Sequence, residues 1–222
     1  MATEIELKLL LVDEAAHDVV RSALDRIDPH ATTLDQVNYY LDTPRADLHA
    51  QGAMVRRRVQ SGQTVLTVKT RPVMSGGVVQ VGEWEKVLTG PDIDAWLVAA
   101  PARVQIAQLQ ATEWLSEPGV LTSPLPPETW LHVVGAMANT RRVYRFDRAQ
   151  FGLGTGEIKV ELDHARYGVG GQDSHRYEVE VEDADAHNLR PALEKWLDSL
   201  GVVHWPADET KFAQLLRLLR DH

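Results

Sequence analysis

The opening stretch of the chain alternates charged and apolar residues. Glu4, Glu6 and Lys8 alternate with apolar neighbours such as Ile5 and Leu7. Because successive side chains of a β-strand point to opposite faces, this pattern predicts a strand with one charged and one apolar face. The same alternation returns in residues 56–58, 67–69, 83–85, 161–163 and 178–182. Several strands are therefore expected to place ionised groups on one side only.

The remaining patterns predict three amphipathic helices around these strands. An apolar stripe at helical spacing covers residues 13–27, with Asp13 as the N-cap, and two further stripes lie at 189–200 and 212–219. Strands are expected at 37–41, 53–60, 64–70, 78–88, 130–134, 140–147, 157–163 and 176–182, separated by glycine-containing turns. The fold class is therefore α+β, dominated by antiparallel strands.

The middle of the chain differs from both halves. Residues 93–115 are mostly compatible with a helix, although Pro101 interrupts them, and residues 118–127 are rich in proline. Residues 92–129 therefore form a helical and proline-rich insertion, whose role the pattern does not indicate.

Two architectures satisfy the alternation. In the first, the apolar side of each strand forms the core and the charges face water. In the second, the sheet closes with its charged face inward and helices cover its apolar outer side. The alternation alone leaves both open, but the amphipathic helices need an apolar surface to pack on, which the second arrangement provides.

Composition excludes several classes of function. The net charge of −9 over 222 residues argues against nucleic acid as the main partner. The chain has no cysteine, so a disulfide framework and a thiolate metal site are excluded. No signal peptide is recognisable and no apolar run approaches the ~20 residues of a membrane span, so we expect a cytoplasmic protein without a membrane partner.

The presence of both signs of charge suggests two ligands of opposite charge. Cations gather as Lys8, Arg56, Arg58, Lys69 and Arg141, whereas Arg57 points away from its neighbours and is expected to be a surface charge. Like charges that share an enclosed interior are costly unless something neutralises them. A polyphosphate would neutralise the cations, and Mg²⁺ or Mn²⁺ would neutralise the carboxylates.

The motifs resemble those of the CYTH superfamily, the triphosphate tunnel metalloenzymes. They are Glu4-x-Glu6-x-Lys8, Leu41-Asp42-Thr43-Pro44, Arg56-x-Arg58, Leu66-Thr67-Val68-Lys69, Glu83-Trp84-Glu85, Arg141, Glu161-Leu162-Asp163, Glu178-Val179-Glu180 and Thr210-Lys211-Phe212. They occur in order over nearly the whole chain and look most similar to the tripolyphosphatase and thiamine triphosphatase branches.

The resemblance implies one domain over residues 1–222, a closed antiparallel eight-stranded β-barrel with a charged interior. It implies phosphate contacts from Lys8, Arg56, Arg58, Lys69, Arg141 and Lys211. It implies metal ligation by Glu4, Glu6, Asp163, Glu178 and Glu180. It gives Glu4, Glu6, Lys8, Glu83 and Glu85 as catalytic residues, with Glu83 and Glu85 binding a second metal or orienting the attacking water. Relatives often carry an arginine shortly before Glu83, where this chain has Gln80.

The expected activity is hydrolysis of the terminal phosphate of a triphosphate, with Mg²⁺ or Mn²⁺ as cofactor and inorganic tripolyphosphate as substrate. Three alternatives remain: a thiamine triphosphatase, an adenylyl cyclase that makes cyclic AMP and pyrophosphate from ATP, and a polyphosphate-binding module without catalysis. The expected partner is a small anionic triphosphate, and the protein is expected to be a monomer or a homodimer.

Overall fold

The computed structural model describes residues 2–88, 103–109, 112–117, 120–152 and 154–221. Its strands are β1 (Ala2–Leu11), β2 (Thr32–Asp42), β3 (Ala53–Gln60), β4 (Gln63–Ser75), β5 (Val78–Leu88), β6 (Arg103–Gln105), β7 (Trp130–Asp147), β8 (Glu157–Val169), β9 (Gln172–Glu182) and β10 (His204–Pro206). Its helices are α1 (Glu14–Ile27), α2 (Asp47–Ala50), α4 (Thr112–Leu115), α5 (Ala186–Ser199) and α6 (Lys211–Arg220), and 3₁₀ turns cover Ile106–Gln108 and Arg148–Phe151. Among the described helices, none is both long and apolar enough to cross a bilayer.

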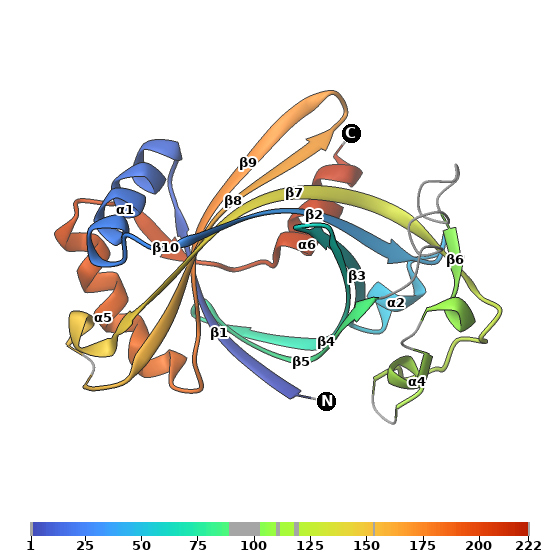
Figure 1. Ribbon diagram of the computed structural model, residues 1–222. Coiled ribbons are helices and arrows are strands. Elements are labelled where there is room, and N and C mark those ends of the chain that lie inside the picture. Colours follow the sequence, from blue (N-terminus) through green and yellow to red (C-terminus); the bar gives the residue numbers. More distant parts are fainter. Residues whose placement is uncertain (1, 89–102, 110–111, 118–119, 153, 222) are drawn as a thin grey trace.

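Eight of the strands close into an antiparallel barrel. Their order is β1-β5-β4-β3-β2-β7-β8-β9, and β9 pairs with β1 again (Figure 1). Closure depends on β1, whose first half pairs with β5 and whose second half pairs with β9. The short strands β10 and β6 extend the sheet beside β1 and β7. The closed barrel confirms the expected fold.

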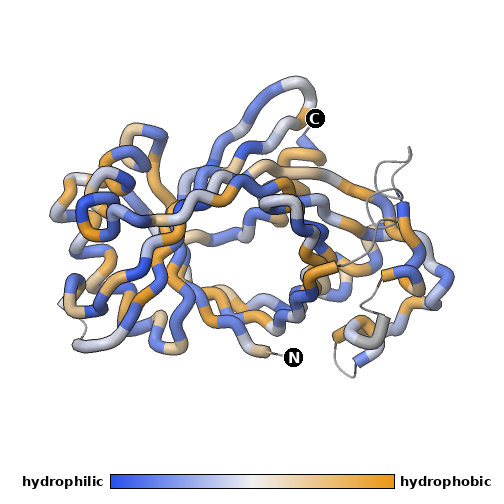
Figure 2. The backbone as a smooth tube through the Cα atoms, in the orientation of Figure 1, coloured by the Kyte–Doolittle hydropathy of each residue, from blue (hydrophilic) through white to orange (hydrophobic). Residues whose placement is uncertain are grey.

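The barrel turns its charged face inward because its apolar outer face is covered. Leu162 and Val179, on the outer side of β8 and β9, are fully buried in one cluster with Val20 of α1 and Leu189 of α5. Helices α1 and α5 lie together on one side of the barrel (Figures 1 and 2). Burial of each such aliphatic side chain contributes about 1.5–3 kcal/mol, and this arrangement buries the apolar faces of the helices together with those of the strands.

The described part of the 92–129 region covers another part of the outer face. Leu66 and Trp84, on the outer side of β4 and β5, pack in a second cluster with Val104, Ile106 and Leu121. The expected helix is wrong at residues 103–105, which form β6 against β7. Residues 89–102 lie outside the described part, so the helical expectation for 93–102 and Pro101 is not tested.

Two further expectations are corrected. Residues 130–134 and 140–147, expected as separate strands, belong to the single strand β7, because β2 pairs along its length and a bulge at Tyr40/Leu41 absorbs the irregularity. Arg57 does point away from the interior, but it is only 5% exposed and not a surface charge. Its guanidinium lies 5.5 Å from the centre of the Tyr39 ring, so its stem and head pack on the barrel wall.

Candidate functional site

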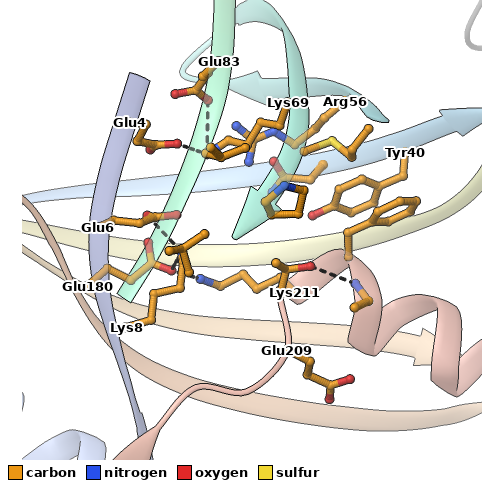
Figure 3. Close-up of a pocket in the computed structure, with 18 of the residues that line it drawn as sticks. Glu4, Glu6, Lys8, Tyr40, Arg56, Lys69, Glu83, Glu180, Glu209 and Lys211 are labelled. Carbon is orange, nitrogen blue, oxygen red and sulfur yellow. Dashed lines mark hydrogen bonds and ion pairs between the residues drawn. The ribbon is translucent and has the colours of Figure 1, made fainter. Parts of the chain in front are cut away.

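The barrel encloses a cavity of about 590 Å³ lined by residues of α6 and of its eight strands. Each side chain that the sequence predicts for catalysis or phosphate binding lines this cavity: Glu4, Glu6, Lys8, Arg56, Arg58, Lys69, Glu83, Glu85, Arg141 and Lys211. Figure 3 shows several of them converging from different strands. Alternation therefore identified inward-facing residues of the strands, the resemblance supplied Lys211 of α6, and closure of the barrel brought them together.

Three carboxylates on β8 and β9 form the most deeply buried acidic group, which we call the inner carboxylates. Asp163 and Glu178 are fully buried and Glu180 is 2% exposed. One oxygen from each lies within 4.8 Å of the others. Asp163 and Glu178 face each other across the β8–β9 ladder, and Glu180 is two residues further along the same face of β9.

Lys211, the first residue of α6, reaches all three inner carboxylates. Its Nζ lies 2.9 Å from Asp163 Oδ2 and 2.5 Å from Glu180 Oε1, and it also forms an ion pair with Glu178. The hydroxyl of Thr210 accepts a hydrogen bond from the Ala213 amide and caps the helix, which sets where Lys211 begins. A residue from the end of the chain thus completes a cluster built by β8 and β9.

Two more cations flank the inner carboxylates. Lys8 Nζ lies 2.6 Å from Glu180 Oε1 and 3.0 Å from Glu6 Oε2. Arg141 donates from Nε and Nη2 to the two oxygens of Asp163, at 2.8 and 2.6 Å, and Nη2 also lies 2.6 Å from Glu180. This bidentate geometry is the strong form of an arginine–carboxylate contact.

The close pairing shifts three pKa values of this cluster toward the ionised form. Burial raises the pKa of Asp163, but Arg141 and Lys211 outweigh it and hold this pKa below its ordinary value. The pKa of Glu180 lies well below its ordinary value because Lys211, Lys8 and Arg141 outweigh the effect of burial. Burial lowers the pKa of Lys211, but the inner carboxylates outweigh it and raise this pKa well above its ordinary value.

A second cluster lies where β1, β4 and β5 meet. Lys69 forms an ion pair with Glu4 and lies 3.2 Å from Glu83, as Figure 3 shows. Desolvation by burial, followed by the charge of Glu4, raises the pKa of Glu83 to about 7, although Lys69 opposes the shift. One ammonium shared between two carboxylates leaves Glu83 only partly compensated.

Glu85 belongs to a third group on β3, β4 and β5. It accepts hydrogen bonds from Thr67 Oγ1 at 2.8 Å and from the Nη2 atoms of Arg56 and Arg58 at 3.3 and 3.2 Å. Burial raises the pKa of Glu85, but the two arginines outweigh it and lower the pKa. Both arginines therefore line the cavity in a fixed position.

The five expected metal ligands do not form one group in this structure. Asp163, Glu178 and Glu180 are the inner carboxylates, Glu6 is linked to them through Lys8, and Glu4 lies in the cluster with Lys69 and Glu83. The inner carboxylates are the one set of described residues whose ligand atoms lie close enough together to hold an ion. Their oxygen atoms are the donor type that Mg²⁺ and Mn²⁺ prefer.

Two cations of the interior were not predicted from the sequence. Arg176 is 6% exposed and donates from Nε to Glu178 Oε1 at 2.8 Å, from Nη1 to Gln214 Oε1 at 2.9 Å and from Nη2 to the Glu209 carbonyl at 2.7 Å. Lys159 lines the cavity and lies 3.2 Å from Glu161. Each precedes a recognised carboxylate by two residues on its own strand, so the period of two would have found both.

Two motif positions lie outside the charged interior. The Asp42 carboxylate accepts hydrogen bonds from the backbone amides of Thr43, Leu48 and His49 at 2.7–3.0 Å, so it holds the turn and α2. Gln80 is exposed on the outer side of β5, and the cavity is lined instead by Val79 and Val81. An arginine at Gln80 would not face the cavity in this register.

Comparison with known sequences and structures matches nearly the whole chain to one family. The sequence profile of the CYTH domain matches residues 2–210. YjbK of Bacillus subtilis (strain 168), whose name describes it as a triphosphatase, is 28% identical over 209 residues, which cover 94% of this chain and 90% of that protein. The structure of HpAC1 from Hippeastrum, described as having a dominant triphosphatase activity, is 28% identical with a TM-score of 0.77, over 96% of this chain and 95% of that one. A Bacillus halodurans structure with 20% identity and a TM-score of 0.60, covering 96% and 98% of the two chains, shares the fold.

Proposed function

We propose, from the premise that this chain belongs to the CYTH domain family, that it hydrolyses the terminal phosphate of inorganic tripolyphosphate in a reaction that requires Mg²⁺ or Mn²⁺. The coarser activity, hydrolysis of a phosphoanhydride bond, is supported by its triphosphatase relatives. The observation that carries the finer proposal is the enclosed cavity of about 590 Å³ lined by cations from several strands and α6.

Phosphate oxygens are bound by the cations of this cavity. The planar forks of Arg56 and Arg58 suit bidentate contact with a phosphate, while Lys8, Lys69 and Lys211 act as point charges. Because these groups come from separate strands and one helix, they hold a linear triphosphate at several points and present its terminal phosphate in one orientation.

Carboxylates of the barrel interior supply the remaining functions. The inner carboxylates, with Glu6 beside them, would hold a divalent cation, and Glu4 would contribute to a second one if it binds. The metal, when bound, neutralises charge on the phosphate oxygens and on the leaving pyrophosphate. Glu83 and Glu85 orient the attacking water. Its oxygen bonds to the terminal phosphorus in line as the bridging P–O bond breaks, pyrophosphate departs with the electron pair of that bond, and the ionised Glu83 carboxylate takes a proton from the water.

The aromatic residues favour an inorganic substrate. Among the described residues, no tryptophan lines the cavity. Tyr40 and Phe212 do line it, but their rings stack on each other with centroids 4.7 Å apart, and the His49 ring lies perpendicular to Phe212 with its centroid 5.8 Å away. Because the Tyr40 and Phe212 rings are also only 2% and 8% exposed, these two aromatic rings of the described cavity lining offer little open face to a thiamine or adenine ring.

A substrate panel with product analysis tests the proposal. We expect phosphate release from tripolyphosphate with Mg²⁺ or Mn²⁺, and slower reaction with thiamine triphosphate and ATP. Lys69→Met is expected to lower kcat/KM about 100-fold or more, as removal of a single preorganised charge contact does in other enzymes. Lys86→Met is the matched control, because Lys86 is an exposed lysine on β5.

The alternatives give distinct outcomes in the same panel. Cyclic AMP and pyrophosphate from ATP would indicate a cyclase, and preferred turnover of thiamine triphosphate would replace the inorganic substrate. Tight tripolyphosphate binding without turnover in either metal would leave a binding module. Unchanged kinetics in Lys69→Met would contradict a phosphate contact from Lys69.

A further inference from the structure

The Nζ atom of Lys211 lies where three carboxylates converge. It contacts Asp163 and Glu180 at 2.9 and 2.5 Å and also pairs with Glu178. Oxygen atoms of these three residues lie within 4.8 Å of one another, which is the spacing of ligands around a shared cation. An ammonium therefore occupies the centre of the set with the best geometry for a divalent ion.

No other described cation has this position. Lys8 contacts Glu180 but neither Asp163 nor Glu178, and its second partner is Glu6. Arg141 contacts both oxygens of Asp163 and one of Glu180, but its contacts among the described residues do not include Glu178. Lys211 alone among the described residues pairs with all three inner carboxylates.

The charge of this region is already balanced without a metal. Its buried or half-buried carboxylates are equal in number to the cations that contact them: Glu6, Glu161, Asp163, Glu178 and Glu180 against Lys8, Arg141, Lys159, Arg176 and Lys211. One further carboxylate, the exposed Glu182, also pairs with Lys159 at the solvated end of the group. A divalent cation added to this arrangement would bring two uncompensated positive charges into a poorly solvated interior, which is unfavourable. It would be accommodated if Lys211 moved away and an anion entered.

We propose that Lys211 holds the place of the divalent cation in the metal-free protein, so that the metal enters the inner carboxylates only as the Lys211 ammonium withdraws toward the phosphates. This inference rests on the proposed function, because a triphosphate is the anion that receives Lys211. Metal and triphosphate then bind cooperatively, and the metal binds weakly when it is alone.

The structure allows Lys211 to move without displacing its helix. Arg176 holds the start of α6 through the Gln214 side chain and the Glu209 carbonyl, at 2.9 and 2.7 Å. Thr210 caps the same turn. The lysine side chain also lines the cavity, so rotation about its own flexible stem carries Nζ from the carboxylates toward the space where phosphates bind.

Binding of Mn²⁺ without triphosphate tests the inference, with free Mn²⁺ followed by electron paramagnetic resonance. Lys211→Met is expected to bind one Mn²⁺ at least ~10-fold more tightly than the wild type, because the competing ammonium is gone. Arg217→Met, which removes an exposed arginine from the same helix, is expected to bind like the wild type. The double variant Lys211→Met/Glu178→Gln is expected to lose the gain, which locates the ion.

Equal or weaker Mn²⁺ binding by Lys211→Met would overturn the inference. If that variant does not fold, wild-type crystals soaked in Mn²⁺ together with a non-hydrolysable triphosphate analogue decide the question. Mn²⁺ at the inner carboxylates with Lys211 withdrawn supports the proposal. Lys211 still in contact with all three, or Mn²⁺ bound only elsewhere, refutes it.

These binding measurements are independent of turnover. If Lys211→Met gains Mn²⁺ affinity but the wild type does not hydrolyse tripolyphosphate, the proposed function is refuted and the place-holding role of Lys211 stands. If the wild type hydrolyses tripolyphosphate but Lys211→Met shows no gain in Mn²⁺ affinity, the proposed function stands and the place-holding role is refuted.

Discussion

Replacement of Arg176 by methionine tests how the inner carboxylates are held. Arg176 is 5% exposed at its side chain and pairs with the fully buried Glu178, with Nη2 2.6 Å from Glu178 Oε1. Its other hydrogen bonds reach Gln214 on α6 and the Glu209 carbonyl before it. The variant therefore weakens the link between β9 and α6 and leaves a buried carboxylate with less compensation.

The expected cost follows from this burial. Breaking a buried ion pair by removing one partner lowers the free energy of unfolding by about 3–5 kcal/mol, mostly because the remaining charge is uncompensated. Removing the charge of Glu178 as well should recover part of this loss. In a double-mutant cycle of Arg176→Met and Glu178→Gln, we expect a coupling of about 1–3 kcal/mol.

The measurement is urea unfolding followed by both tryptophan fluorescence and circular dichroism, so that coincident transitions justify a free energy. Arg217→Met is a matched control, because Arg217 contacts the Glu209 side chain at 2.7 Å but is 47% exposed. An exposed pair contributes about 1 kcal/mol or less. If Arg176→Met costs no more than Arg217→Met, the buried link between β9 and α6 does not hold the site.

Three further predictions concern pH and close packing. The pKa of Glu83 is raised to about 7 from an ordinary value of 4.5, chiefly by desolvation. The folded state therefore binds the carboxyl proton of Glu83 more tightly than the unfolded state does, and the protein loses stability as the pH rises from about 4.5 to about 7. Glu83→Gln should therefore reduce the difference in unfolding free energy between pH 5 and pH 8, by as much as about 3 kcal/mol; equal pH profiles would contradict this. Gly77 has φ +80°, and an added Cβ would lie 2.7 Å from the Lys8 carbonyl oxygen, whereas Gly171 has φ +77° with open space around it. Gly77→Ala should therefore cost more than the ~1–2 kcal/mol of backbone strain expected for Gly171→Ala, measured as urea midpoints, and equal costs would refute the close contact. A Cβ on Gly135 would lie 2.9–3.2 Å from leucine side chains of α6, so Gly135→Val should push that helix outward, lower stability by about 1–3 kcal/mol and reduce turnover, and wild-type melting and turnover would refute this packing.

Much of the barrel was predictable from the sequence because a strand's side chains alternate with a period of two. That period assigned Glu4, Glu6 and Lys8 to one face, and the cap at Asp13 is confirmed by the hydrogen bond that its Oδ1 accepts from the Ala16 amide at 2.9 Å. These are local properties, decided by residues close in the chain. The same rule applied to Arg176 and Lys159 would have found these two interior cations as well.

Tertiary structure alone decided which charges meet. Lys8 and Glu180 are 172 positions apart, and they pair because β1 closes the barrel against β9. Closure also placed Glu4 beside Lys69 and apart from the inner carboxylates, although the resemblance names all four carboxylates as metal ligands. Alternation tells which side of a strand is charged, but the curvature and closure of the sheet determine whether that side is inside, and those depend on packing between residues far apart in the chain. The place of Lys211 among three buried carboxylates follows from the docking of α6 on the barrel, which no local pattern contains.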